Sequence, residues 1–76
     1  MTNVGLPVAG YQPQSDLNVA VVNNNKSIEE QVLRVLDGLA THEGIDMRWL
    51  AIARTHIEQG FMAANRAVFK PGRVQL

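Results

Sequence analysis

The sequence has no cysteine, no net charge and no long apolar run, and each absence removes a class of protein. Lys and Arg number seven among the 76 residues, and so do Asp and Glu. Without cysteine there is no disulfide and no thiolate metal site. Balanced charge argues against DNA or RNA as the partner, because duplex binders usually carry a basic stripe. No signal peptide opens the chain and no membrane span is present, so we expect a soluble, intracellular protein.

Catalytic constellations are missing as well. No nucleophile with a partner base, no paired carboxylates and no phosphate-binding loop can be found. His42 and His56 lie in different predicted elements, and neither has the spacing of a metal-binding helix. We therefore expect no enzyme activity, no metal and no cofactor.

The chain is short but apolar. Hydrophobic residues make up 46% of it, which is too many for a disordered tail. A chain of this length buries only about 60% of its unfolded surface, so its own core is marginal. We expect one domain, 1–76, that buries further surface by forming a homo-oligomer.

The second half of the chain, 46–69, has the most regular apolar period and predicts a helix. Asp46 can cap its start, and Pro71 with Gly72 ends it after Phe69. The apolar positions step by three or four residues: Leu50, Ala53, Ile57, Phe61, Ala64 and Val68.

One turn of that helix carries unusually small side chains, at Gly60 and Ala64. A glycine inside a helix costs about 1 kcal/mol relative to alanine, so it usually has a compensating role. Either tight helix packing or the close approach of another backbone or a ligand would explain it.

A first helix is predicted over 15–41. Its apolar positions are Leu17, Val21, Ile28, Val32, Val35 and Leu39, with Asn24 in the same row. The run 23–25 is three asparagines, which are poor helix formers, and Ser27 with Glu30 matches a capping box. We predict one helix with a kink near Ser27, and a separate short piece over 17–22 remains the alternative.

The two helices predict an all-α fold, an antiparallel helical hairpin. A turn over 41–45 joins them, and Gly44 suits a left-handed helix end. Before them, 1–14 reads as an extended N-terminal arm because Pro7 and Pro13 remove backbone donors. Tyr11 in this arm either anchors it or offers a ring on which a nucleobase stacks.

Three cations stand out among the charged residues. Lys26 is either a solvated lysine or a point charge for a phosphate. Arg66, close to the small residues, could bind an anion with its planar fork or form an intersubunit salt bridge. Arg54 and Glu58 have the i,i+4 spacing of a surface ion pair.

The run over 53–71, ARTHIEQGFMAANRAVFKP, closely resembles the hairpin of the phage anti-CBASS protein 2 family, and the related hairpin of phage anti-Thoeris sponges is similar. The hallmark looks like AR-x-x-I-x-x-GFM-A-x-NRA-x-x-x-P. The resemblance implies a phage-encoded protein in the host cell cytoplasm. Such proteins sequester cyclic oligonucleotide second messengers without cleaving them, so the CBASS effector is never activated. They assemble as homohexamers.

The resemblance also implies two kinds of ligand site. Cyclic dinucleotides such as 3′,3′-cGAMP sit between paired protomers against an arm tyrosine and a first-helix lysine, which Tyr11 and Lys26 match. Cyclic trinucleotides sit in some members where three protomers meet, against positions that Gly60, Ala64 and Arg66 occupy. Two other functions remain open from the residues alone: a structural oligomerisation module, or a small regulator that binds a host protein.

Overall fold

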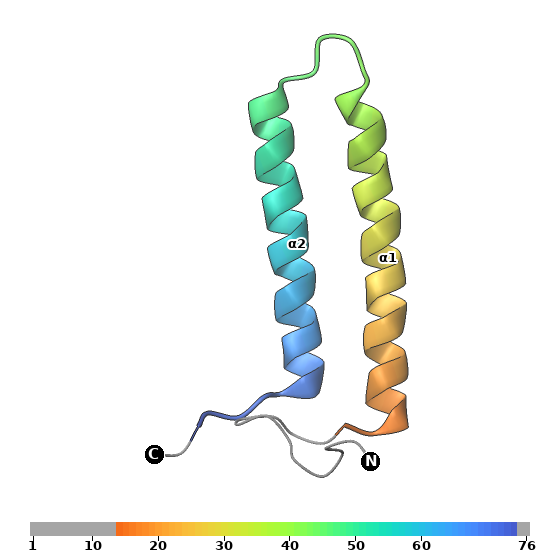
Figure 1. Ribbon diagram of the computed structural model, residues 1–76, viewed down its shortest axis with the longest axis vertical. Helices are drawn as coiled ribbons and strands as arrows, with labels where there is room; N and C mark the ends of the chain where they lie inside the picture. Colours follow the sequence, from red (N-terminus) through yellow and green to blue (C-terminus); the bar gives the residue numbers. More distant parts are fainter. Residues whose placement is uncertain (1–13, 75–76) are drawn as a thin grey trace, which may run out of the picture.

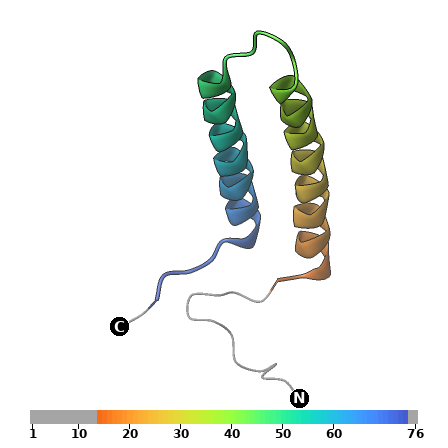
Figure 2. The same ribbon diagram turned by 45° about the horizontal axis from the view of Figure 1, so that its top comes forward.

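A computed structural model describes residues 14–74, which form two helices joined by a short turn (Figure 1). Helix α1 is Asp16–Ala40 and helix α2 is Met47–Phe69. The helices lie side by side and antiparallel in both views (Figure 2). The described part has no strand, and the predicted all-α hairpin is confirmed. Helix α1 lies one residue inside the predicted range at both ends.

Both helices begin at the capping residues that the sequence offered. The hydroxyl of Ser15 accepts a hydrogen bond from the backbone N–H of Asn18 at 3.1 Å. The carboxylate of Asp46 accepts from the backbone N–H groups of Arg48 and Trp49 at 3.0 and 3.1 Å. Each cap satisfies N–H groups that the helix itself leaves without partners.

The helix ends also follow local chemistry. Thr41 closes α1, since its hydroxyl donates to the carbonyl of Gly38 at 2.8 Å. Gly44 has a φ of 82°, so the left-handed conformation predicted for it is confirmed. Helix α2 ends where Lys70 takes a left-handed φ of 47° directly before Pro71.

Helix α1 runs without a break through its three asparagines. Ser27 lies within the helix and caps nothing, and Glu30 pairs instead with Arg34 at 3.0 Å. The alternative of a separate piece over 17–22 is wrong. The ribbon of α1 shows no sharp bend anywhere along its length, so the predicted kink is not observed (Figure 1). Contact with α2 explains this, because tertiary packing outweighs weak local helix propensity.

The interior of the hairpin is small. In the described part of the chain only three hydrophobic side chains are buried: Val22, Leu36 and Leu50. The face of α1 that meets α2 carries Val22 and Leu36, and it also includes half-buried Asn25.

Most of the apolar positions of α1 that were expected to face the core do not face it, and only Val32 among them is half-buried. Five of them form what we call the apolar stripe, and they are 38–73% exposed: Leu17, Val21, Ile28, Val35 and Leu39. Each step along a helix turns by about 100°, so Val35 points to a flank while its neighbour Leu36 points at α2. The expected core face of α1 is thus an outward face of the hairpin.

In α2 the expected face is mostly the inner one. Leu50 is buried, and Ala53, Ile57, Phe61 and Val68 are half-buried. Ala64 is the exception, because it is exposed.

Two polar contacts fix how α1 and α2 are aligned. Asn25 Nδ2 donates to Asn65 Oδ1 at 3.0 Å, and Arg54 Nη2 donates to Asp37 Oδ1 at 2.7 Å. The residue numbers of the partners add to 90 and 91, as one antiparallel register requires. Arg54 therefore pairs across the hairpin with Asp37, and the expected ion pair with Glu58 is wrong. In this register Lys26 is level with Ala64.

Candidate functional site

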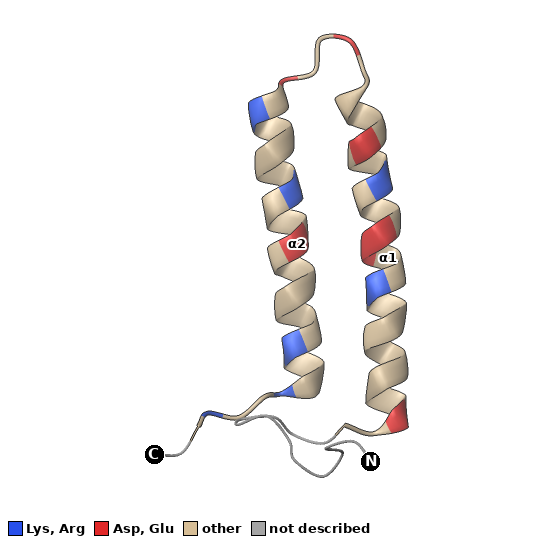
Figure 3. Cartoon of the chain, in the orientation of Figure 1, with Lys and Arg blue, Asp and Glu red and all other residues tan. Residues whose placement is uncertain are grey.

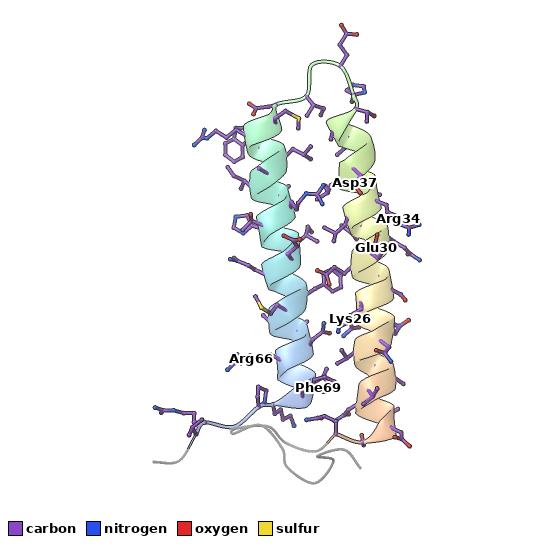
Figure 4. The ribbon with its side chains drawn as sticks, viewed as in Figure 1. Lys26, Glu30, Arg34, Asp37, Arg66 and Phe69 are labelled. Carbon is purple, nitrogen blue, oxygen red and sulfur yellow. The ribbon has the colours of Figure 1, made fainter. Side chains whose placement is uncertain are left out.

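Lys26 and Arg66 lie at similar positions along the long axis of the hairpin, one on each helix (Figure 4). Both side chains are exposed, and neither forms a hydrogen bond or ion pair with another residue of the described range 14–74. Each follows one member of the Asn25–Asn65 pair in sequence. Two cations without partners at one level of the hairpin are available to an anion.

Gly60 and Ala64 line a shallow hollow on a flank of α2. Its volume is about 220 Å³, and we call it the small-residue hollow; its lining is His56, Ile57, Gly60, Phe61 and Ala64. A Cβ added to Gly60 would meet no atom within 4 Å. Gly60 is therefore not required for packing of α2 against α1, and its surface is open to something outside the hairpin.

Arg66 does not line the small-residue hollow. Arg66 comes two residues after Ala64 in the sequence. Two residues turn an α-helix by about 200°, so the Arg66 side chain points to the other side of α2. The sequence placed Arg66 close to the small residues, but within one protomer they lie on different flanks. Within one chain, Arg66 and the small-residue hollow therefore face different directions.

A second, larger hollow continues along the same helix towards the turn. It has a volume of about 510 Å³ and is lined by Arg48, Ala51, Ile52, Thr55 and His56. His56 belongs to both hollows. Both are open surfaces, whereas ligand pockets enclose most of their ligand, so the residues that line these hollows do not by themselves form an enclosed pocket.

The charges of the hairpin are mixed. Figure 3 shows acidic and basic residues interspersed along both helices, with no face of one sign in that view. Within residues 14–74 no group of three or more His, Asp or Glu could hold a metal ion. No helix in that range is long and apolar enough to cross a membrane.

Sequence reasoning missed the Asn25–Asn65 hydrogen bond. The apolar row predicted for the first helix includes Asn24, whereas Asn25 is the asparagine that faces α2. Counting from Val22 to Leu36 through Asn25 gives steps of three or four residues, which would have indicated this second face.

Tyr11 lies outside the described residues, and its predicted role stays a prediction. The other four predicted ligand residues divide into an exposed lysine on α1, two small residues in one hollow of α2, and an arginine on the opposite flank. One protomer does not bring all of them together.

These features define a small helical hairpin whose described candidate ligand residues, Lys26, Gly60, Ala64 and Arg66, are all exposed. The chain belongs to the Acb2/Tad1 hairpin domain family, because the model of that domain matches residues 6–69. The resemblance to anti-CBASS protein 2 is thereby confirmed. Membership fits a sponge for cyclic oligonucleotides, which is a binding function and not a catalytic one. No curated protein and no solved structure matches the chain.

Proposed function

We propose that this protein is a phage anti-defence sponge that binds cyclic dinucleotides and cyclic trinucleotides in the host cytoplasm and holds them uncleaved. The messenger would then not reach the CBASS effector. The observation that carries the proposal is the family match over 6–69, which contains the whole GFM-A-x-NRA stretch of α2.

Burial supports an assembly, which we propose is a homohexamer. Ten large hydrophobic side chains of the described residues are at least 38% exposed, whereas three are buried. A soluble monomer would present this apolar surface to water at a cost of roughly 25 cal/mol per Å². Covering the apolar stripe with a second protomer removes that cost, and a closed symmetry would repeat the contact on every copy.

For a cyclic dinucleotide we propose Tyr11 and Lys26. A tyrosine ring can stack on a base, and the lysine ammonium can neutralise a phosphate. Lys26 is exposed and has no acidic partner among residues 14–74, so its charge is free for a ligand. A twofold interface would present two such pairs to a ligand with two bases and two phosphates.

For a cyclic trinucleotide we propose Gly60, Ala64 and Arg66. The small-residue hollow leaves room for the ligand, and Arg66 supplies charge and a planar fork. Because Arg66 and the hollow lie on opposite flanks of α2, a pocket where three protomers meet would combine the hollow of one copy with the arginine of the next. This arrangement agrees with a ligand of threefold symmetry.

Calorimetric titration with 3′,3′-cGAMP and with cyclic tri-adenylate, together with the mass in solution, tests the proposal. We expect a hexamer that binds about three dinucleotides and two trinucleotides by symmetry. Tyr11→Ala should abolish dinucleotide binding alone, and Arg66→Ala should abolish trinucleotide binding alone. No heat with either ligand would contradict the sponge and favour a structural module or a protein partner.

Sequestration has its own test. After incubation, the protein is denatured and the released ligand is analysed by chromatography. An intact cyclic ligand is the expected result, and linear nucleotides would show that the protein cleaves its ligand.

A further inference from the structure

The Asn25–Asn65 pair is the one side-chain hydrogen bond between helices in which both partners are half-buried, among the described residues. Nδ2 of Asn25 donates to Oδ1 of Asn65 at 3.0 Å. Along the helices, the pair lies between apolar residues: Val22 one turn before Asn25, with Phe61 and Val68 on either side of Asn65. The ion pair nearer the turn is different, since the Asp37 side chain is 64% exposed.

Apolar contacts alone do not define one alignment of two helices. Burial of apolar surface is not directional, so a slip by one turn can bury a similar area. A polar pair in an apolar seam is satisfied in one register only, as single asparagines in coiled coils demonstrate. In this hairpin only Val22, Leu36 and Leu50 are buried among the described hydrophobic residues, so apolar packing constrains the alignment weakly.

The same pair stands directly beside both proposed ligand sites. Lys26 follows Asn25 on α1, and Arg66 follows Asn65 on α2. Lys26 is also level with Ala64 in the observed register. A slip of α1 by one turn would move Lys26 by about 5 Å relative to α2, which exceeds the reach of a hydrogen bond.

We propose that Asn25 and Asn65 are a positioning pair that fixes the register of α1 on α2 and thereby sets Lys26 and Arg66 for both ligand classes. This inference rests on the function proposed above. It separates the pair from the ligand residues, each of which serves one ligand, because loss of the register would affect both.

Calorimetric titration of the full-length variants Asn25→Ala and Asn65→Ala with both cyclic ligands provides the test. We expect each variant to bind 3′,3′-cGAMP and cyclic tri-adenylate about tenfold more weakly, the size of one hydrogen bond in net free energy. The matched control is Asn23→Ala, the same change at an exposed asparagine of the same helix. Loss of one ligand only would contradict the shared positioning role.

A leucine pair distinguishes positioning from simple stabilisation. Replacing both asparagines by leucine fills the seam with apolar side chains, so the midpoint of chemical denaturation should rise. Binding of both ligands should nevertheless fall about tenfold, because directional alignment is lost. Tighter or unchanged binding in this more stable protein would show that the pair only stabilises the hairpin.

A measurement without ligand tests the register itself. The chain has no cysteine, so Asp16→Cys and Glu58→Cys place two spin labels at exposed positions of the two helices. Labelled protein is diluted into unlabelled protein so that only distances within one chain are read. The leucine pair should broaden the distance distribution or shift it by about 5 Å, one helical turn. An unchanged narrow distribution would contradict the register role.

The two proposals fail in different ways. If the wild-type chain binds neither ligand, the proposed function is wrong, and the label distances alone decide whether the pair sets the register. If the wild-type chain binds both ligands and the asparagine variants bind equally well, the sponge stands and the positioning pair is wrong.

Discussion

The two helices of the hairpin use their apolar residues differently. In α2 the regular apolar face meets α1, with Leu50 buried and Phe61 half-buried. In α1 the regular apolar row is turned to the outside, and Val35 in it is 62% exposed. The neighbouring residue Leu36, only 8% exposed, belongs to the face that meets α2.

Helix α1 therefore has two faces with apolar residues, and α2 covers only one of them. Periodicity shows that a face is apolar, but it does not show which neighbour covers that face. A monomeric hairpin would leave the apolar stripe in water, whereas an assembly would bury it. Substitutions on the outer face should therefore change the assembly, and substitutions on the inner face should change the stability of the hairpin.

Val35→Glu should abolish the assembly. It places a charge within the apolar stripe, and burying an unpaired charge at an interface costs several kcal/mol. Light scattering should show the mass falling towards the 8.4 kDa of one chain. Asn23→Asp is the control, since it adds the same charge at an exposed polar position of α1. An unchanged mass for Val35→Glu would show that the stripe is not an interface.

Leu36→Ala tests the inner face and should lower the free energy of unfolding by about 2–4 kcal/mol, the usual cost of truncating a buried leucine. The comparison is Leu17→Ala on the stripe, at a site 73% exposed in the single chain. For Leu17→Ala, the loss of stability should appear only as a stronger dependence of the denaturation midpoint on protein concentration. Chemical denaturation at several concentrations measures both, and equal concentration dependence would remove the distinction between the faces.

The two helices and the turn between them could be predicted from the sequence, because each is defined by residues that lie next to one another in the chain. Caps at Ser15 and Asp46, the turn glycine Gly44 and the stop at Pro71 each act within a few residues. The orientation of α1 could not be obtained this way, since it depends on which of its two apolar faces meets α2, and that contact joins residues far apart in the sequence.

The ligand residues named from the sequence stay a prediction, and the structure tests only how those of the described range are arranged. Gly60 and Ala64 were expected to share a surface, and they line one hollow. Arg66 was expected beside them and lies on the other flank, because two residues turn a helix by more than half a revolution. The Asn25–Asn65 contact joins residues 40 apart in sequence, so no local pattern could show it.

Gly60→Ala should raise stability and lower binding. An added Cβ at Gly60 meets nothing within 4 Å, so the helix gains about 1 kcal/mol in propensity. The same methyl group narrows the small-residue hollow, and affinity for cyclic tri-adenylate should fall by about tenfold or more.

Gly38→Ala is the matched control, because Gly38 is also a helical glycine with open space around its Cβ position. It should give the same gain in stability, measured by thermal unfolding, without any change in calorimetric affinity. If the two alanine variants bind equally well, Gly60 is not at a ligand site.

The Asp37–Arg54 ion pair should show the smallest effect, and the two partners should differ. An exposed pair contributes less than about 1 kcal/mol, which Arg54→Gln would lose. Asp37 lies near the C-terminal end of α1, where a negative charge is unfavourable by about 0.3–1 kcal/mol. Asp37→Asn relieves that repulsion while it removes the pair, so its net effect on the free energy of unfolding should be close to zero. Denaturation at low and at 1 M salt checks this reasoning, since screening should bring the two variants together. A cost above about 2 kcal/mol for either variant would mean that the assembly buries the pair, which would place a further interface along the seam of the hairpin.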